Sequence, residues 1–241
     1  MKIGITGASG RMGQSLTNII ENTDGLELSG AIDKGDELAP FFKAADVVID
    51  FTIPDATMTH VDMAVQTGTP LVIGTTGLSD DQEVILQSSA GKTPILYAAN
   101  MSVGVNMLMA LVEQTASRLG IDWDIEIFET HHHHKIDSPS GTALALGKAA
   151  QNGRSKTIEG GGDFIIDRTG KRNAGDIGYA VQRGGDVVGE HDVTFFSQGE
   201  RITLGHKATD RSLFAKGAVR AAQWIAEKPA GLYNMRDLLN L

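Results

Sequence analysis

Cysteine is absent from this chain of 241 residues, so disulfides and thiolate metal sites are excluded. A chain without cysteine fits a reducing compartment, and we expect a cytoplasmic protein. Long apolar runs are absent too. No segment approaches the roughly 20 apolar residues of a membrane-spanning helix, and the first residues reach glycine before any run of signal-peptide length. We therefore expect neither membrane insertion nor secretion.

Basic residues are few and form no stripe along the chain. Lys and Arg number 21 against 30 Asp and Glu, which gives a formal net charge of -9. Because nucleic-acid binding depends on neutralising many phosphates, nucleic acid is not an expected partner. The hydrophobic fraction of 41% and the charged fraction of 21% are those of a globular protein, and the length suffices for two small domains.

Short apolar runs alternate with helical patterns through the first hundred residues. Helical periodicity covers residues 12–22 and 56–66, and Ser79-Asp-Asp-Gln82 is a capping box that opens a further helix. Strand-like runs occupy residues 2–6, 26–32, 46–51, 70–74 and 94–99. This alternation predicts an α/β fold, a Rossmann-like doubly wound parallel sheet with right-handed crossovers.

A glycine-rich turn, Gly7-Ala-Ser-Gly-Arg-Met-Gly13, follows the first predicted strand. Glycines at such a turn let a pyrophosphate approach the backbone, and the N–H groups of the next helix face its charge. Asp33 ends the second predicted strand, where an acid can accept hydrogen bonds from ribose hydroxyls. The alternative is a simple glycine turn with a surface aspartate. Lys34 could meet the 2′-phosphate of NADP or could be a solvated loop lysine, so the sequence suggests tolerance of NADH and NADPH.

The pattern changes after about residue 102. A long helix is predicted at 103–119, an alternating strand at 123–129, and a helix that starts after Ser140 as its cap. Residues 157–206 resemble strands separated by turns at 160–162, 183–186 and 197–200, which we expect to be hairpins. The second domain is therefore predicted to be α+β, on a mixed or antiparallel sheet. A helix at 212–227 should return to the first domain, which gives a dinucleotide-binding domain at 1–101 plus 212–241 and a substrate-binding and oligomerisation domain at 102–211.

Residues 129–142, Glu-Thr-His-His-His-His-Lys-Ile-Asp-Ser-Pro-Ser-Gly-Thr, concentrate imidazoles, an ammonium and a helix start. No metal site is expected, because neighbouring residues of an extended segment point to opposite faces and no His-Glu-x-x-His spacing occurs. An internal run of histidines is also a poor candidate for an expression tag. Lys135 follows His131 by four residues, and helix N–H groups follow Lys135. A solvated basic loop is the alternative, but we favour a site for a small dicarboxylate.

The same segment resembles the E-x-H-H-x-x-K-x-D-x-P-S-G-T signature of the 4-hydroxy-tetrahydrodipicolinate reductase family. The resemblance extends over essentially the whole chain. It includes residues 7–13, 50–52, 74–77, 98–106, 189–191, 206–208 and 231–239.

The resemblance implies a nicotinamide-dependent reductase of diaminopimelate and lysine biosynthesis, which transfers hydride from nicotinamide C4 and then protonates the product. His131 would be the general acid and Lys135 a second proton donor that also holds a substrate carboxylate. His132 would contact the substrate, and Ser140, Gly141 and Thr142 would bind a carboxylate. The NADH or NADPH site would comprise Gly7, Ala8, Ser9, Gly10, Arg11, Met12, Asp33, Lys34, Gly74, Thr75, Thr76, Ala98, Ala99, Asn100 and Met101.

The resemblance also implies a homotetramer joined through the second-domain sheet, and domain closure about hinges near residues 101 and 211. His133 and His134 occupy variable positions of the signature and receive no catalytic role. Ile53 stands where some members carry an arginine near the cofactor. Two alternatives stay open from the residues themselves: a nucleotide-sensing regulator without turnover, and a reductase of another small imine or aldehyde.

Overall fold

The computed structural model describes residues 1–156, 158–159 and 161–241. It divides into two compact units. The first unit comprises Met1–Val103 and Ser212–Asn240, and the second comprises Gly104–Arg211. Among the described residues, no helix is long and apolar enough to cross a membrane. The functional roles predicted for the two halves of the sequence remain predictions, and each unit is described by itself.

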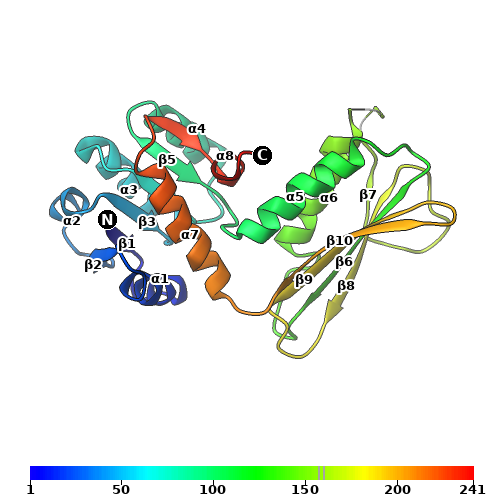
Figure 1. Cartoon of the computed structure of the whole chain (residues 1–241), viewed down its shortest axis with the longest axis horizontal. Coiled ribbons are helices and arrows are strands. Elements are labelled where there is room, and N and C mark those ends of the chain that lie inside the picture. Colours follow the sequence, from blue (N-terminus) through cyan, green and yellow to red (C-terminus); the bar gives the residue numbers. More distant parts are fainter. Residues whose placement is uncertain (157, 160) are drawn as a thin grey trace. The chain divides into compact units, whose positions relative to one another are not determined.

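The first unit is built on a six-stranded parallel sheet with the order β11-β5-β4-β3-β1-β2 (Figure 1). Its strands are β1 (Lys2–Thr6), β2 (Glu27–Ile32), β3 (Val47–Asp50), β4 (Leu71–Ile73), β5 (Pro94–Tyr97) and β11 (Gly231–Tyr233). The central strands β3 and β4 are buried along their full lengths, because helices cover both faces of a parallel sheet. The predicted Rossmann-like fold is confirmed. The strand β11 was not predicted, since a three-residue segment carries no measurable period.

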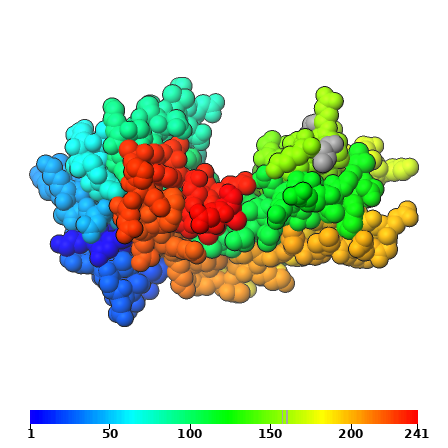
Figure 2. Space-filling model, turned by 45° about the horizontal axis from the view of Figure 1, so that its top comes forward, coloured from blue at the N-terminus to red at the C-terminus, as the bar shows by residue number. Residues whose placement is uncertain are grey.

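Helices form a layer on each face of this sheet. The helices α1 (Arg11–Glu21) and α7 (Ser212–Ile225) pack on one face with Ile3, Ile5 and Ile49 in the core between. The opposite face is covered by α2 (Leu38–Ala44), α3 (Pro54–Thr67) and α4 (Asp80–Ala90). The short helix α8 (Met235–Leu239) packs against α7, and β11 pairs with β5 and packs against α4. In Figure 2 the red C-terminal segment adjoins the blue-green part of the first unit.

Local signals explain where several of these helices begin. Ser79 Oγ accepts a hydrogen bond from the Gln82 N–H at 3.3 Å, and the Gln82 side chain accepts one from the Ser79 N–H at 2.9 Å. This is the predicted capping box. The helix α2 was not predicted because it has only seven residues and contains Pro40.

The second unit has a five-stranded mixed sheet with the order β10-β9-β6-β8-β7. Its elements are α5 (Val103–Ala116), β6 (Asp124–His131), α6 (Gly141–Arg154), β7 (Phe164–Ile165), β8 (Ile177–Arg183), β9 (Gly189–Phe196) and β10 (Arg201–Ala208). The central strand β6 pairs in parallel with β8 and antiparallel with β9. The helices α5 and α6 cover one face of this sheet with an apolar core.

The expected hairpin turns are only partly correct. Residues 197–200 do form a hairpin between β9 and β10, with the Ser197 N–H donating to the Glu200 carbonyl at 3.0 Å. Residues 183–186 do not form one, because β6 lies between β8 and β9. At 160–162, Gly160 lies outside the described residues, and Gly161 and Gly162 connect a helix to a strand. Sequence periodicity identifies strands, but it cannot tell which strand inserts between two others.

Candidate active site

The glycine turn of the first unit is required by close backbone approaches. Gly7 has a φ of +77°, and a Cβ there would lie 2.6 Å from the Phe51 carbonyl oxygen. A Cβ on Gly13 would lie 2.3 Å from the Gly7 carbonyl oxygen. The helix α1 follows directly, and its N-cap Gly10 offers no side-chain cap. The first N–H groups of a helix lack intrahelical partners, so this end of α1 can receive an anion.

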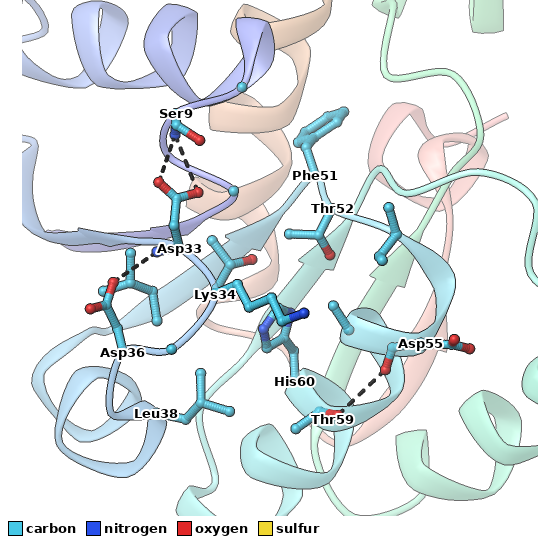
Figure 3. Close-up of a pocket in the computed structure, with 17 residues that line it drawn as sticks. Ser9, Asp33, Lys34, Asp36, Leu38, Phe51, Thr52, Asp55, Thr59 and His60 are labelled. Carbon is cyan, nitrogen blue, oxygen red and sulfur yellow. Dashed lines mark hydrogen bonds between the residues drawn. The ribbon is translucent and has the colours of Figure 1, made fainter.

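A cleft of about 720 Å³ opens beside this turn (Figure 3). It lies over the carboxyl ends of β1, β2 and β3. Because β2 and β3 flank β1 on opposite sides, the chain connections from β1 run in opposite directions along the sheet at this point. Open α/β sheets bind their ligands at this switch point. The residues that line the cleft are Thr6, Gly7, Ser9, Gly10, Ile32, Asp33, Lys34, Gly35, Asp36, Leu38, Phe51, Thr52, Ile53, Asp55, Ala56, Thr59 and His60.

Asp33 is positioned at this cleft by two backbone contacts. Its carboxylate accepts hydrogen bonds from the Ser9 N–H at 3.0 and 3.3 Å, and its own N–H donates to the Asp36 carboxylate at 2.9 Å. Figure 3 shows this chain of contacts from the glycine turn to the loop after β2. The arrangement ties the acid at the end of β2 to the glycine turn, with Lys34 beside it on the wall of the cleft.

Five residues of the predicted cofactor site line the cleft: Gly7, Ser9, Gly10, Asp33 and Lys34. Others have internal contacts. The Thr75 side chain is 3% exposed, and its hydroxyl accepts hydrogen bonds from the Thr52 N–H and the Thr57 hydroxyl, both at 2.9 Å. Met101 belongs to the hydrophobic core. Three further predicted residues, Ala8, Gly74 and Ala98, donate backbone N–H hydrogen bonds to residues of neighbouring strands. The Asn100 side chain accepts a hydrogen bond from the Ser102 N–H. The remaining predicted residues, which also do not line the cleft, are Arg11, Met12, Thr76 and Ala99.

In the wall formed by the start of α3, only Ile53 is placed near the cofactor by the family resemblance, and the other residues of the wall were not predicted. Ile53, Asp55, Ala56, Thr59 and His60 line the cleft there. The signal that could have found them was available, because α3 begins directly after β3 and the carboxyl ends of parallel strands share one edge.

The second unit contains a separate cluster of polar groups at the end of β6. Glu129 is only 1% exposed, and its carboxylate accepts two hydrogen bonds from the Arg183 guanidinium at 2.8 and 2.9 Å. It also accepts one from the Ser140 N–H at 2.9 Å and contacts His131 Nδ1. Burial alone would raise the pKa of Glu129. The hydrogen bonds from Arg183, His131 and Ser140 lower it by more than burial raises it, so the pKa of Glu129 lies below its usual range.

His131 and His191 meet beside this carboxylate. Their rings are edge to face, with centroids 5.1 Å apart. Burial lowers the pKa of His131. The Glu129 carboxylate raises this pKa, whereas the positive charges of Lys135 and Arg183 lower it. Burial also lowers the pKa of His191 to about 4, with a smaller contribution from His131. Both imidazoles are therefore predominantly neutral near pH 7 in the protein alone.

Ser140 holds the start of α6 next to these imidazoles. Its hydroxyl accepts a hydrogen bond from the Ala143 N–H at 3.2 Å, as the predicted cap requires, and lies 3.0 Å from His191 Nε2. Ser140 is 2% exposed, so its side chain serves the cap and the imidazole. Gly141 and Thr142 form the first turn of α6, where backbone N–H groups favour an anion.

The loop after β6 carries the remaining predicted residues. Lys135 Nζ lies 2.8 Å from the Asp137 carboxylate, and His132 Nε2 lies 3.0 Å from an Arg211 nitrogen. His133 and His134 are exposed, with ring centroids 3.8 Å apart. The sequence thus located His131, His132, Lys135 and Ser140. It gave no site role to their contact partners Glu129, Arg183, His191 and Arg211. The contacts of Arg183 and His191 depend on the pairing of β8 and β9 with β6, which the sequence does not display.

A group of side chains that could bind a metal occurs among the described residues at Glu129, His131 and His191, with donor atoms within 4.8 Å of one another. The donor set favours an ion pair instead. Both Glu129 oxygens already accept hydrogen bonds from Arg183, and a cation would have to displace or adjoin that guanidinium. The Glu129 carboxylate of this cluster is therefore the partner of a guanidinium.

The two sites together define a class of protein. A glycine turn with an acid at the end of β2 is the pattern of a dinucleotide-binding fold, and an imidazole that can take up a proton beside a helix N-terminus suits acid–base chemistry on a bound anion. The class is an oxidoreductase that uses NADH or NADPH.

Comparisons with known proteins identify the family. Models of the N-terminal and C-terminal parts of dihydrodipicolinate reductase match residues 1–101 and 104–239. A 4-hydroxy-tetrahydrodipicolinate reductase of Zymomonas mobilis is 47% identical, covering 100% of this chain and 98% of that protein. One from Caulobacter vibrioides is 46% identical, covering 99% and 97%. The chain belongs to the dihydrodipicolinate reductase family and is an NAD(P)H-dependent oxidoreductase.

Solved structures agree in fold. A dipicolinate-bound dihydrodipicolinate reductase from Paenisporosarcina sp. TG-14 superimposes with a TM-score of 0.82 at 23% identity, covering 97% of each chain. An engineered D-amino acid dehydrogenase bound to NADP+ gives a TM-score of 0.57 at 14% identity, covering 98% of this chain and 93% of that one.

Proposed function

We propose that this protein reduces 4-hydroxy-tetrahydrodipicolinate to tetrahydrodipicolinate with NADH or NADPH, in the diaminopimelate route to lysine. The observation that carries the proposal is the Glu129–His131 pair beside the N-terminus of α6, which combines a proton-transfer group with an anion-binding helix end. The identity of 47% to a reductase of that name over the whole chain supports the same reaction.

The cleft of the first unit fits the cofactor. The glycines at 7 and 13 permit the close turn, the start of α1 receives the pyrophosphate, and Asp33 accepts from a ribose. When bound, NAD(P)H supplies the hydride. Lys34 is the cationic residue of the wall and would meet a 2′-phosphate, while Asp33 and Asp36 favour a free ribose hydroxyl.

The second unit would bind the substrate and move the proton. The resemblance assigns one substrate carboxylate to Ser140, Gly141 and Thr142. Because the Ser140 N–H donates to Glu129, the backbone N–H groups of Gly141 and Thr142 would hold that carboxylate, and Lys135 and His132 would contact the substrate from the loop after β6. Burial lowers the pKa of His131 in the protein alone, so bound substrate would favour its charged form. A bound dicarboxylate adds negative charge and raises the pKa of a nearby imidazole, so His131 could then donate a proton together with Lys135.

The exposed face of the second sheet, opposite α5 and α6, would join subunits of a homotetramer. Phe128 on β6 alternates with the core residues Ile125 and Ile127, so it points to this open face, where it is 39% exposed. Analytical ultracentrifugation tests this part, and a monomer at micromolar concentration would contradict it.

The central test couples the purified protein to a dihydrodipicolinate synthase that makes the substrate from pyruvate and aspartate semialdehyde. We expect synthase-dependent loss of nicotinamide absorbance with NADH, NADPH or both. His131→Ala should lower the rate by about 10²-fold or more, since it removes a proton-transfer group. His133→Ala is the matched control in the exposed part of the same histidine run and should retain the rate. Cofactor binding with no oxidation of either nicotinamide would contradict the proposal and favour a sensor.

A further inference from the structure

The Glu129 carboxylate is the common partner of three separate segments. Arg183 on β8 contacts both oxygens, His131 on β6 contacts Oε2, and the Ser140 N–H at the start of α6 donates to Oε1. Glu129 is thereby bonded to the proposed proton-transfer group and to the proposed carboxylate-binding helix end. A single buried side chain connects the two.

The contact with Glu129 sets the tautomer of His131. An ionised carboxylate only accepts hydrogen bonds, so His131 Nδ1 must carry the hydrogen. In the neutral imidazole, Nε2 then carries the lone pair. In the charged imidazolium, Nε2 carries the proton that can be transferred. Nε2 faces the backbone of Gly189, where an added Cβ would lie 2.9 Å away.

Arg183 also holds the loop that carries Lys135. Its guanidinium donates to the Asp137 carbonyl at 2.7 Å, and the neighbouring Gly184 N–H donates to the His131 carbonyl at 2.9 Å. In the sheet register, Arg183 lies directly opposite His131. The planar guanidinium can contact a carboxylate with two nitrogens and a carbonyl at once, which a lysine ammonium cannot reproduce.

The charges around His131 come from several elements. Glu129 is on its own strand, Arg183 on β8, His191 on β9 and Lys135 on the following loop. Glu129 is the negative member of this set and raises the pKa of His131, while Arg183 and Lys135 lower it. Removing the Glu129 charge therefore has a defined sign, because it lowers the pKa of His131 further.

We propose that Glu129 and Arg183 form a positioning pair that fixes the Nδ1–H tautomer of His131 and holds the start of α6 beside it. Neither residue needs to touch the substrate. The kinetic part of this inference rests on the proposed function, whereas the tautomer is a property of the protein alone.

The first test is nitrogen-15 NMR of histidine-labelled protein without substrate. We expect His131 of the wild type to show the Nδ1–H tautomer, and Glu129→Gln to lose that preference. Glutamine preserves the shape without the charge. Glu113→Gln is the matched control, because Glu113 is on α5 near Gly153 at the far end of α6 and pairs with Lys156. A wild-type His131 in the Nε2–H tautomer, or an unchanged tautomer in Glu129→Gln, would overturn the proposal.

The second test is the pH dependence of turnover. We expect Glu129→Gln to lower kcat/KM by about 10²-fold, the usual scale for an impaired proton-transfer group. In the plot of kcat/KM against pH, the part that depends on protonated His131 should shift to lower pH. Arg183→Lys should keep part of the activity and Arg183→Met should lose more, while cofactor binding stays unchanged in all three. Folding of each variant is checked by circular dichroism, and if Arg183→Met unfolds, Arg183→Lys carries the comparison.

The outcomes separate the two proposals. Failure of the wild type to reduce the substrate would sink the proposed function and leave the NMR result standing. A uniform loss of kcat in Glu129→Gln with an unchanged pH profile and an unchanged tautomer would mean a structural pair only, and would overturn the positioning role.

Discussion

The cleft of the first unit is formed mainly by backbone groups, whereas the cluster of the second unit is formed by buried side chains. The cleft depends on backbone: glycines that permit close approach, a helix start, and an aspartate held by a main-chain N–H. The cluster depends on buried side chains, with Glu129, His131 and His191 all removed from water. A backbone site is therefore sensitive to added atoms, and a buried polar site is sensitive to lost charges and to pH.

The largest expected effect breaks the cluster and spares the cleft. Lys135→Ala should lower kcat by about 10²-fold or more, because it removes a proposed proton donor and carboxylate contact. NADH binding, measured by quenching of its fluorescence, should be unchanged. Lys148→Ala on the exposed side of α6 is the control. Normal turnover in Lys135→Ala would contradict the assignment.

The second effect is a loss of stability in acid that originates in the cluster. Burial lowers the pKa of His191 to about 4 in the folded protein, and the pKa values of His131 and His206 are also lowered. The unfolded chain then binds more protons between about pH 6.5 and pH 4. The contribution of these neutral histidines to the free energy of unfolding is complete above pH 6.5 and should be lost through this window, by up to about 3 kcal/mol for His191 alone.

Chemical denaturation at several pH values measures this loss. His191→Gln should flatten the slope between pH 6.5 and 4, and His134→Gln, which changes an exposed imidazole, should leave it unchanged. A slope that is the same in the wild type and His191→Gln would show that His191 is not held neutral.

The third effect acts on the cleft. Gly7→Ala adds a Cβ 2.6 Å from the Phe51 carbonyl oxygen at a φ of +77°. We expect a loss of about 1–3 kcal/mol in stability and a weaker affinity for NADH, because the turn must shift. Gly25→Ala is the matched control, since Gly25 has a φ of +81° but no atom within 4 Å of the added Cβ. Equal losses in both variants would attribute the effect to φ strain alone.

The smallest effect concerns the choice of cofactor. Lys34→Ala should weaken NADPH binding by less than tenfold and leave NADH binding nearly unchanged, because an exposed charge contact contributes only about 0.2–1 kcal/mol. Titrations of both cofactors measure the ratio, with Lys43→Ala on α2 as the control. A similar loss for both cofactors would mean that Lys34 does not meet the 2′-phosphate.

The same difference explains how much the sequence could predict. The parallel sheet, the glycine turn with Asp33, the Ser79 box and the Ser140 cap depend on local patterns and were predicted. Glu129 is two residues before His131 on β6, but Arg183 and His191, which complete the cluster, lie on β8 and β9, about fifty to sixty residues away along the chain. A mixed sheet sets those pairs through its strand order, which local periodicity does not contain. For that reason the prediction of a hairpin turn at residues 183–186 was wrong.

The most direct test of the central claim follows a label from cofactor to product. The protein is supplied with NADH or NADPH deuterated at the transferable position of nicotinamide C4, and the synthase-generated substrate is added. The account predicts that tetrahydrodipicolinate acquires a single deuterium from the cofactor and that His131→Ala slows its appearance. Product without cofactor deuterium, or none at all despite bound cofactor, would contradict it.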